Sequence, residues 1–180
     1  MSSDKLANPA PIGLLGFGMT TILLSLHNLG LFGLDATIMA VGIFLGGIAQ
    51  VIAGTIEFKR DSMFTATVFT FFGLFWITFV CIDMGIFGVA EQYSLATMFL
   101  LFLILAAVLF VGTLRGNLSL KFAFFMLVIT LFALTCGAYT GWEFLTRAGG
   151  AFGLITGAAA FYIASADILN AQYQKPVLPL

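Results

Sequence analysis

Charged residues are scarce in this chain of 180 residues, in which seven Lys or Arg and eight Asp or Glu make up only 8% of the total. A soluble globular domain carries about 25% charged residues, so this chain has too few charges to cover a surface that faces water. The shortage also excludes a disordered chain, which is polar and highly charged. A net charge of −1 provides no basic face, so nucleic-acid binding is excluded as well.

Histidine and cysteine are almost absent. His27 is the single histidine, and Cys81 and Cys136 are the two cysteines. The cysteines lie in separate apolar runs without CxxC spacing, which fits small packing residues and excludes a disulfide scaffold. The sequence also holds no Ser/His/Asp arrangement, no paired carboxylates inside an apolar run and no phosphate loop. We therefore expect no metal site, no cofactor and no enzymatic activity.

What the chain has in abundance is apolar sequence, with 61% hydrophobic residues and a mean hydropathy of +1.13. A membrane-spanning helix needs about 20 mostly apolar residues, and six runs meet that requirement: 12–31, 36–56, 64–86, 94–113, 119–141 and 148–169. We predict an all-α polytopic membrane protein, a single six-helix bundle over residues 1–180 with tails at 1–11 and 171–180. Because little chain remains outside the runs, any function has to be built inside the bundle.

The basic residues predict the orientation of the bundle. With six spans, both tails and two of the loops share one side, and six of the seven basic residues lie there: Lys5, Lys59, Arg60, Arg115, Lys121 and Lys175. Only Arg147 lies on the other side. Since basic residues favour the cytoplasmic side, we expect a multi-pass protein of the cytoplasmic cell membrane with both termini in the cytoplasm.

Two spans carry unusual polar content. The first contains Thr20, Thr21, Ser25, His27 and Asn28, which in lipid must face protein or water. The second contains Gln50, on a face of glycines spaced four residues apart: Gly42, Gly46 and Gly54. Such glycines predict close helix packing, and the buried amide requires hydrogen-bond partners. Gln50 is either an interhelical hydrogen-bond donor or a donor that faces a pore.

Two further faces have alternative interpretations. The third span has an aromatic stripe that contains Phe72 and Trp76, which is either packed bulk or the apolar constriction of a pore. In the last span Gly153, Thr156 and Ala160 follow one another on neighbouring turns, which predicts either tight packing or the lining of a narrow passage.

One motif is specific. Asn8-Pro9-Ala10-Pro11-Ile12-Gly13-Leu14 resembles the NPAPxGL signature of the acetate uptake transporter (AceTr) family. The likeness continues through Gly16-Phe17-Gly18-Met19-Thr20-Thr21, Leu26-His27-Asn28, Gly46-Gly47-Ile48-Ala49-Gln50, Phe75-Trp76, Gly112-Thr113-Leu114-Arg115-Gly116, Phe124-Phe125, Gly153-Leu154-Ile155, Ile168-Leu169-Asn170 and Val177-Leu178-Pro179. The resemblance therefore spans nearly the whole chain.

The resemblance implies a six-helix protomer in a homo-hexameric ring, with one solute path per protomer. The implied substrate is acetate, with succinate and other short carboxylates as further substrates. In the family a Phe, a Tyr and a Leu form a hydrophobic constriction, and these positions fall on Phe17, Phe72 and Leu127. Phe72 departs from the pattern because it lacks the tyrosine hydroxyl. The small residue at the family's specificity position in the last helix is Ala160.

For such a path, Thr20, Thr21, Asn28 and Gln50 are the candidate polar contacts, because neutral donors replace part of an anion's hydration shell without trapping it. Leu127 and Ala160 are the candidate specificity residues. The sequence leaves proton-coupled symport and an anion channel both open; Asp35, Asp83 and Asp167 are either proton carriers or solvated helix ends. The alternative within transport is a small neutral-solute (urea-type) channel, and the alternative outside it is a membrane sensor or assembly protein. Membrane lipid is the expected surrounding in every case.

Overall fold

The structure, a computed structural model, describes residues 6–180, so Lys5 lies outside the described residues. Every regular element in this range is a helix. In chain order the elements are α1 (Ala10–Asn28), α2 (Ala36–Val41), η1 (Gly42–Ala49), α3 (Gln50–Lys59), α4 (Met63–Asp83), α5 (Gln92–Thr113), α6 (Leu118–Thr140) and α7 (Glu143–Tyr173).

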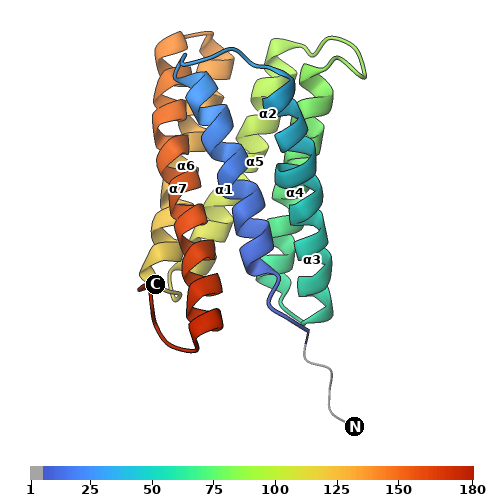
Figure 1. Ribbon diagram of the computed structural model, residues 1–180. Helices are drawn as coiled ribbons and strands as arrows, with labels where there is room; N and C mark the ends of the chain where they lie inside the picture. Colours follow the sequence, from blue (N-terminus) through green and yellow to red (C-terminus); the bar gives the residue numbers. More distant parts are fainter. Residues whose placement is uncertain (1–5) are drawn as a thin grey trace.

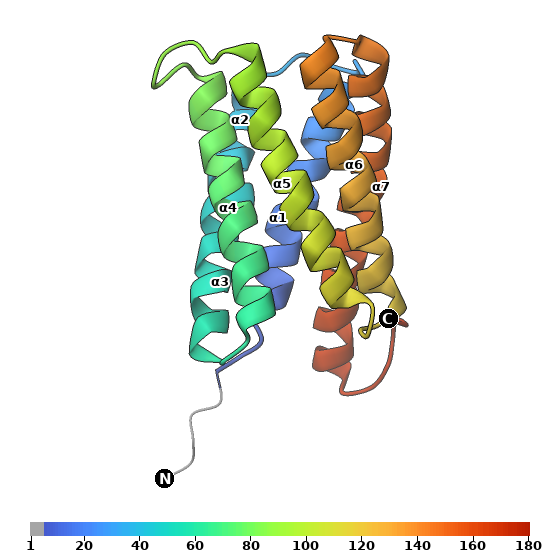
Figure 2. The same ribbon diagram turned by 180° about the vertical axis from the view of Figure 1, so that it is seen from behind.

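Within residues 6–180, six helical units are long and apolar enough to cross a membrane, because α2, η1 and α3 form one continuous unit over Ala36–Lys59. This confirms the prediction of an all-α six-span bundle. Successive units run in opposite directions (Figure 1), so α1, α4 and α6 run parallel to one another. Figure 1 shows α1 between α7 and the α2–α3 unit, and Figure 2 shows α5 crossing the opposite face between α4 and α6.

The two ends of the bundle differ. The end that holds the chain termini is here called the terminal end; residues 60–62 and 114–117 turn there as well. The opposite end, which holds the connections 29–35, 84–91 and 141–142, is called the distal end. Each of α1, α4 and α6 begins at the terminal end, so residues later in these three helices lie closer to the distal end.

Most helix ends lie within a few residues of the predicted runs, and two of the differences have a clear physical cause. The first helix ends at Asn28 and not at residue 31, because the chain turns at Gly30 with a φ of +85°. The last helix begins at Glu143, five residues before the predicted run, since a polar first turn also forms helix. There the exposed Glu143 and Arg147 form an ion pair with a distance of 2.7 Å. Hydropathy locates the apolar part of a helix and misses such turns.

Glycines allow α1 to pack closely against its neighbours. A Cβ on Gly18 would lie 2.8 Å from the carbonyl oxygen of Gly157, and a Cβ on Gly157 would lie 2.9 Å from that of Gly18. The two backbones of α1 and α7 are therefore in direct contact. Gly157 lies on α7 between Gly153 and Ala160, so this part of the last span packs tightly against α1.

The second unit contains a π-helix. Residues Gly42–Ala49 form η1, so the spacing of four that links Gly42, Gly46 and Gln50 does not describe one straight α-helical face. Gly42 lies against the Val80 side chain, and Gly46 lies between the side chains of Thr20 and Trp76. The glycines of η1 thus admit side chains from α1 and α4.

The C-terminal segment is docked and is not a free tail. Residues 171–173 continue α7, and the chain then folds back along this helix. The Asn170 side chain donates to the carbonyl oxygen of Leu178 at 2.8 Å and accepts from the backbone N–H groups of Val177 and Leu178 at 2.6 and 2.9 Å. The Tyr162 hydroxyl donates to the carbonyl oxygen of Pro179 at 2.8 Å. Within the predicted tail at 171–180, the first residues are therefore helical and these hydrogen bonds hold the last ones against α7.

Candidate functional site

Two cavities lie one after the other inside the bundle. The larger has a volume of about 200 Å³ and is lined on α1, α4 and α6 by residues from Phe17, Phe72 and Leu127 onward. The smaller has about 30 Å³, and its lining on the same helices ends at those three residues. Given the direction of these helices, the larger is the distal cavity and the smaller the terminal cavity. One water molecule needs about 10–15 Å³ of such volume, so the terminal cavity is very narrow.

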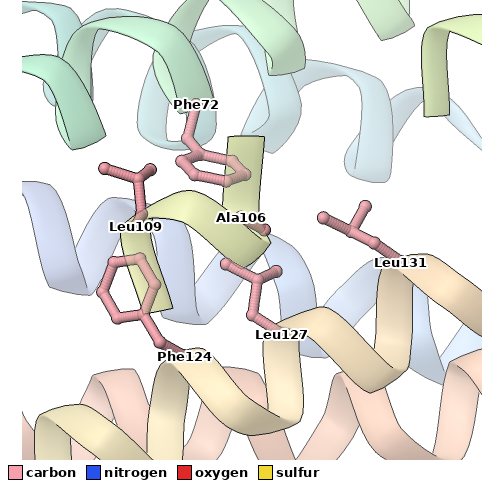
Figure 3. Close-up of a cluster of buried hydrophobic side chains, with 6 residues drawn as sticks. All are labelled: Phe72, Ala106, Leu109, Phe124, Leu127 and Leu131. Carbon is pink, nitrogen blue, oxygen red and sulfur yellow. The ribbon is translucent and has the colours of Figure 1, made fainter. Parts of the chain in front are cut away.

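Phe17, Phe72 and Leu127 line both cavities, and no other residue does so in the described part of the chain. The rings of Phe17 and Phe72 meet edge to face, with centroids 5.9 Å apart and an interplanar angle of 74°. Phe72 and Leu127 are directed into one apolar cluster (Figure 3), completed by Ala106, Leu109, Phe124 and Leu131. The three side chains, here called the apolar ring, form the partition between the two cavities.

The distal cavity is lined mostly by apolar side chains, with a few polar ones among them. Its polar side chains come from α1, α6 and the beginning of α7: Thr21, Ser25, Asn28, Thr130 and Thr146. The helices α4 and α5 contribute aromatic side chains: Phe75, Trp76, Phe79 and Phe99. The cavity therefore offers both polar and apolar contacts to a solute.

The candidate polar residues separate into two groups. Thr21 and Asn28 line the distal cavity, and Gln50 lines the terminal cavity. Gln50 Nε2 donates to the carbonyl oxygen of Gly46 at 2.6 Å, so this donor is bound within its own unit and not to another helix. Ala160, only 2% exposed, also lines the terminal cavity.

Thr20 is placed elsewhere. Its hydroxyl lies 2.8 Å from the carbonyl oxygen of Gly16 and 3.3 Å from that of Val41, and the residue is fully buried. It lines neither cavity. Because the Thr20 hydroxyl donates to these carbonyl oxygens, Thr20 links α1 to the second unit and does not line the site.

Sequence reasoning did not select several polar wall residues as site residues. Thr130 of the distal cavity and Thr156 of the terminal cavity lie 3.0 Å apart, oxygen to oxygen. Their hydroxyls also lie 2.8 and 2.9 Å from the carbonyl oxygens of Met126 and Phe152. The position of Thr130 three residues after Leu127 was an available signal, since residues three apart share a helix face. The pair therefore provides one hydroxyl on the distal side and one on the terminal side of the apolar ring.

The site has no charged wall. Among the described residues, no Asp, Glu, His, Lys or Arg lines either cavity. Asp35 instead caps α2, where its side chain accepts from the backbone N–H groups of Thr37 and Ile38 at 3.0 and 3.1 Å. Whatever occupies the cavities is held by neutral dipoles and apolar contacts.

The chain matches a known family, known sequences and a solved structure over nearly its full length. The model of the GPR1/FUN34/yaaH family matches residues 1–179. The chain is 44% identical over 184 residues to the succinate-acetate/proton symporter SatP of Escherichia coli K12, covering 100% of this chain and 98% of that one. It is 37% identical to an uncharacterized protein of Methanothermobacter thermautotrophicus, covering 98% and 92% of the two chains. The solved structure of the bacterial acetate channel SatP matches with a TM-score of 0.94 and 45% identity, covering 98% of this chain and 99% of that one.

Proposed function

We infer that this chain, which belongs to the GPR1/FUN34/yaaH family, transports acetate across a membrane. It is a multi-pass membrane protein. It is a transport protein and not an enzyme. The relatives are likewise named for the transport of acetate. Succinate, which appears in the name of the Escherichia coli relative, is proposed as a second substrate.

The observation that carries the proposed path is the pair of cavities on either side of the apolar ring. We propose that the solute passes from one cavity to the other between Phe17, Phe72 and Leu127. A carboxylate leaves water only at a high free-energy cost. Thr21 and Asn28 on the distal side and Gln50 on the terminal side would offset part of that cost, while the methyl group of acetate contacts the ring.

Specificity is proposed to reside at the narrowest part. Leu127 belongs to the apolar ring, and Ala160 lies in a cavity of only about 30 Å³. A larger side chain at residue 160 would fill that cavity, and a smaller one at residue 127 would widen the ring. These two positions would therefore set the largest acid that passes.

The flux experiment that tests acetate transport uses purified protein in lipid vesicles. We expect labelled acetate to enter such vesicles faster than protein-free vesicles, with succinate, formate, lactate and urea measured in parallel. An Ala160→Phe variant, which fills the terminal cavity, supplies a control with a blocked path. Urea flux without acetate flux would support the neutral-solute channel, and absence of any flux would support a sensor.

The chemical form of the moving solute is proposed to be the anion. Asp35, Asp83 and Asp167 line neither cavity, so the walls formed by residues 6–180 contain no carboxyl side chain that could carry a proton. Neutral acetic acid is scarce at pH 7, about one molecule in several hundred for a carboxyl pKa of about 4–5. Neutral donors that bind weakly suit repeated passage of the anion.

Anion passage predicts a dependence on voltage. At an imposed membrane potential, we expect net acetate uptake into vesicles to change with the potential, because each ion moves one charge. At a fixed potential, an imposed pH gradient should leave the protein-dependent uptake unchanged after subtraction of the rate in protein-free vesicles. Accumulation that follows the pH gradient at fixed potential would instead establish proton symport.

Orientation and assembly complete the proposal. The terminal end carries the basic residues Lys59, Arg60, Arg115 and Lys175. Since basic residues favour the cytoplasmic side, this supports a protein of the cytoplasmic membrane with both termini in the cytoplasm. Labelling of a cysteine introduced at residue 174, in a variant that lacks Cys81 and Cys136, tests this in intact and opened cells. A homo-hexameric ring is proposed from the family resemblance, and native mass spectrometry tests it.

A further inference from the structure

Three buried polar side-chain atoms have no hydrogen-bond partner in residues 6–180: Thr21 Oγ1, Trp76 Nε1 and Thr135 Oγ1. Buried polar groups are almost always paired, and leaving one unpaired costs free energy. Thr21 and Trp76 both line the distal cavity, whereas Thr135 lines neither cavity. Two of the three unpartnered groups therefore belong to side chains that line the same cavity, which points to an occupant that accepts hydrogen bonds.

The two groups lie at the same level of the path. Thr21 follows Phe17 by four residues on α1, and Trp76 follows Phe72 by four residues on α4. Four residues are about one helical turn, or about 5–6 Å along the axis. Both helices run toward the distal end, so both donors lie one turn beyond the apolar ring. A solute bound in the distal cavity next to the apolar ring would lie at the level of both Thr21 and Trp76.

The Trp76 indole is fixed in place. The side chain is 3% exposed, and its ring makes edge-to-face contacts with Phe75 and Phe79 at centroid distances of 5.8 and 6.2 Å. Thr20 Cγ2 and Trp76 Cγ each lie 2.8 Å from the point where a Cβ on Gly46 would stand. Glycine at this position allows both α1 and α4 to pack closely against η1, which fixes the Trp76 ring.

We propose that the Thr21 hydroxyl and the Trp76 indole N–H form a binding site for the carboxylate group of the solute on the distal face of the apolar ring. This assignment rests on the proposed function and adds Trp76 as a binding residue. An indole N–H only donates, so its partner must be an acceptor, and a carboxylate offers two acceptor oxygens. The absence of a cation among the described wall residues allows the bound anion to leave again.

The site can be tested by the fluorescence of Trp76. The chain has two tryptophans, and Trp142 is exposed, so a Trp142→Phe background leaves Trp76 as the single reporter. Sodium acetate titrated into this purified protein should change the emission of Trp76 with saturation, whereas sodium chloride at equal ionic strength should not. Identical responses to the two salts would mean that water alone occupies the donors, and would overturn the proposal.

Substitution of Thr21 separates binding from packing. Thr21→Val preserves the shape, removes a hydroxyl that has no protein partner, and should raise the apparent Kd for acetate about tenfold or more. Thr21→Ser should retain most of the affinity. Thr135→Val is the matched control, since it removes an equally buried, unpartnered hydroxyl outside both cavities, and it should leave the Kd unchanged. Equal Kd values for Thr21→Val and Thr135→Val would overturn the proposal.

Flux supplies a second and independent measurement. In vesicles, Trp76→Phe keeps an aromatic ring and removes the N–H, so it should raise the acetate concentration at half-maximal uptake by about tenfold or more. If the wild-type chain transports acetate and neither substitution changes this concentration, the site is wrong and the proposed function stands. If acetate binds at Trp76 without any flux, the proposed function is wrong and the site stands.

Discussion

A Gly16→Ala variant is expected to lose about 3 kcal/mol of stability, because the added methyl group would have to occupy the position of the Leu45 carbonyl oxygen in η1. Both groups belong to backbones, so no side-chain rotation relieves the overlap. For a chain of this size, such a loss lowers the midpoint of thermal unfolding by about 10 °C. The measurement is thermal unfolding of purified protein in the same detergent as the wild type.

The matched control is Gly33→Ala. A Cβ on Gly33 would meet no atom within 4 Å, and its φ lies outside the positive range in which glycine is favoured. This variant should therefore unfold within about 1 °C or 2 °C of the wild type, in line with the small effect of exposed substitutions. If Gly16→Ala unfolds as late as Gly33→Ala, α1 does not pack on η1 as described.

The Gly16→Ala substitution should also reduce acetate flux. Gly16 precedes Phe17 of the apolar ring, and Leu45 precedes Gly46, whose carbonyl oxygen accepts from Gln50. A shift of either backbone therefore displaces a wall residue. The close approach of α1 and η1 is thus a requirement of the fold and of the path together.

The general architecture could be predicted from the sequence for a simple physical reason. In hydrocarbon each backbone polar group must be satisfied internally, so a long apolar run has to form a helix. Six such runs separated by short polar connections leave little choice other than an antiparallel bundle. The same argument gives no information on the register of one helix against another, which depends on side-chain packing.

Thr20 and Thr21 illustrate what the sequence could not resolve. The two residues are adjacent and chemically identical, but about 100° apart around the helix axis. Thr20 donates to the carbonyl oxygens of Gly16 and Val41, whereas Thr21 lines the distal cavity. Only the packing of α1 against its neighbours decides which of the two faces a solute.

The π-helix is a second case. Glycines at 42, 46 and 54 predicted one packing face at α-helical spacing, whereas η1 widens each turn over Gly42–Ala49. No local propensity distinguishes the two helix types here. The side chains of Thr20 and Trp76 that enter at Gly46 come from distant parts of the chain. The position of the apolar ring was implied by the family resemblance, but its role as the partition between two cavities required the coordinates.

Leu127→Ala is expected to change the range of acids that pass. Leu127 is one of three side chains that separate the two cavities, so its truncation should join them and widen the narrowest point. Uptake of labelled lactate relative to labelled acetate into vesicles should rise about tenfold, which corresponds to about 1.4 kcal/mol of barrier. The truncation of a buried leucine also costs about 2–5 kcal/mol of stability, so the uptake ratio, which does not depend on the amount of folded protein, is the quantity to measure.

The matched control for this effect is Leu131→Ala. Leu131 lies one turn further along α6, is 4% exposed against 7% for Leu127, and belongs to the same apolar cluster. It lines the distal cavity alone, so its truncation should cost similar stability and leave the lactate-to-acetate ratio unchanged. A higher ratio in Leu127→Ala alone would assign selectivity to the partition between the cavities. A ratio in Leu127→Ala equal to that of the wild type would mean that the apolar ring is not the size filter, because one side chain of the ring could then be removed without effect on what passes.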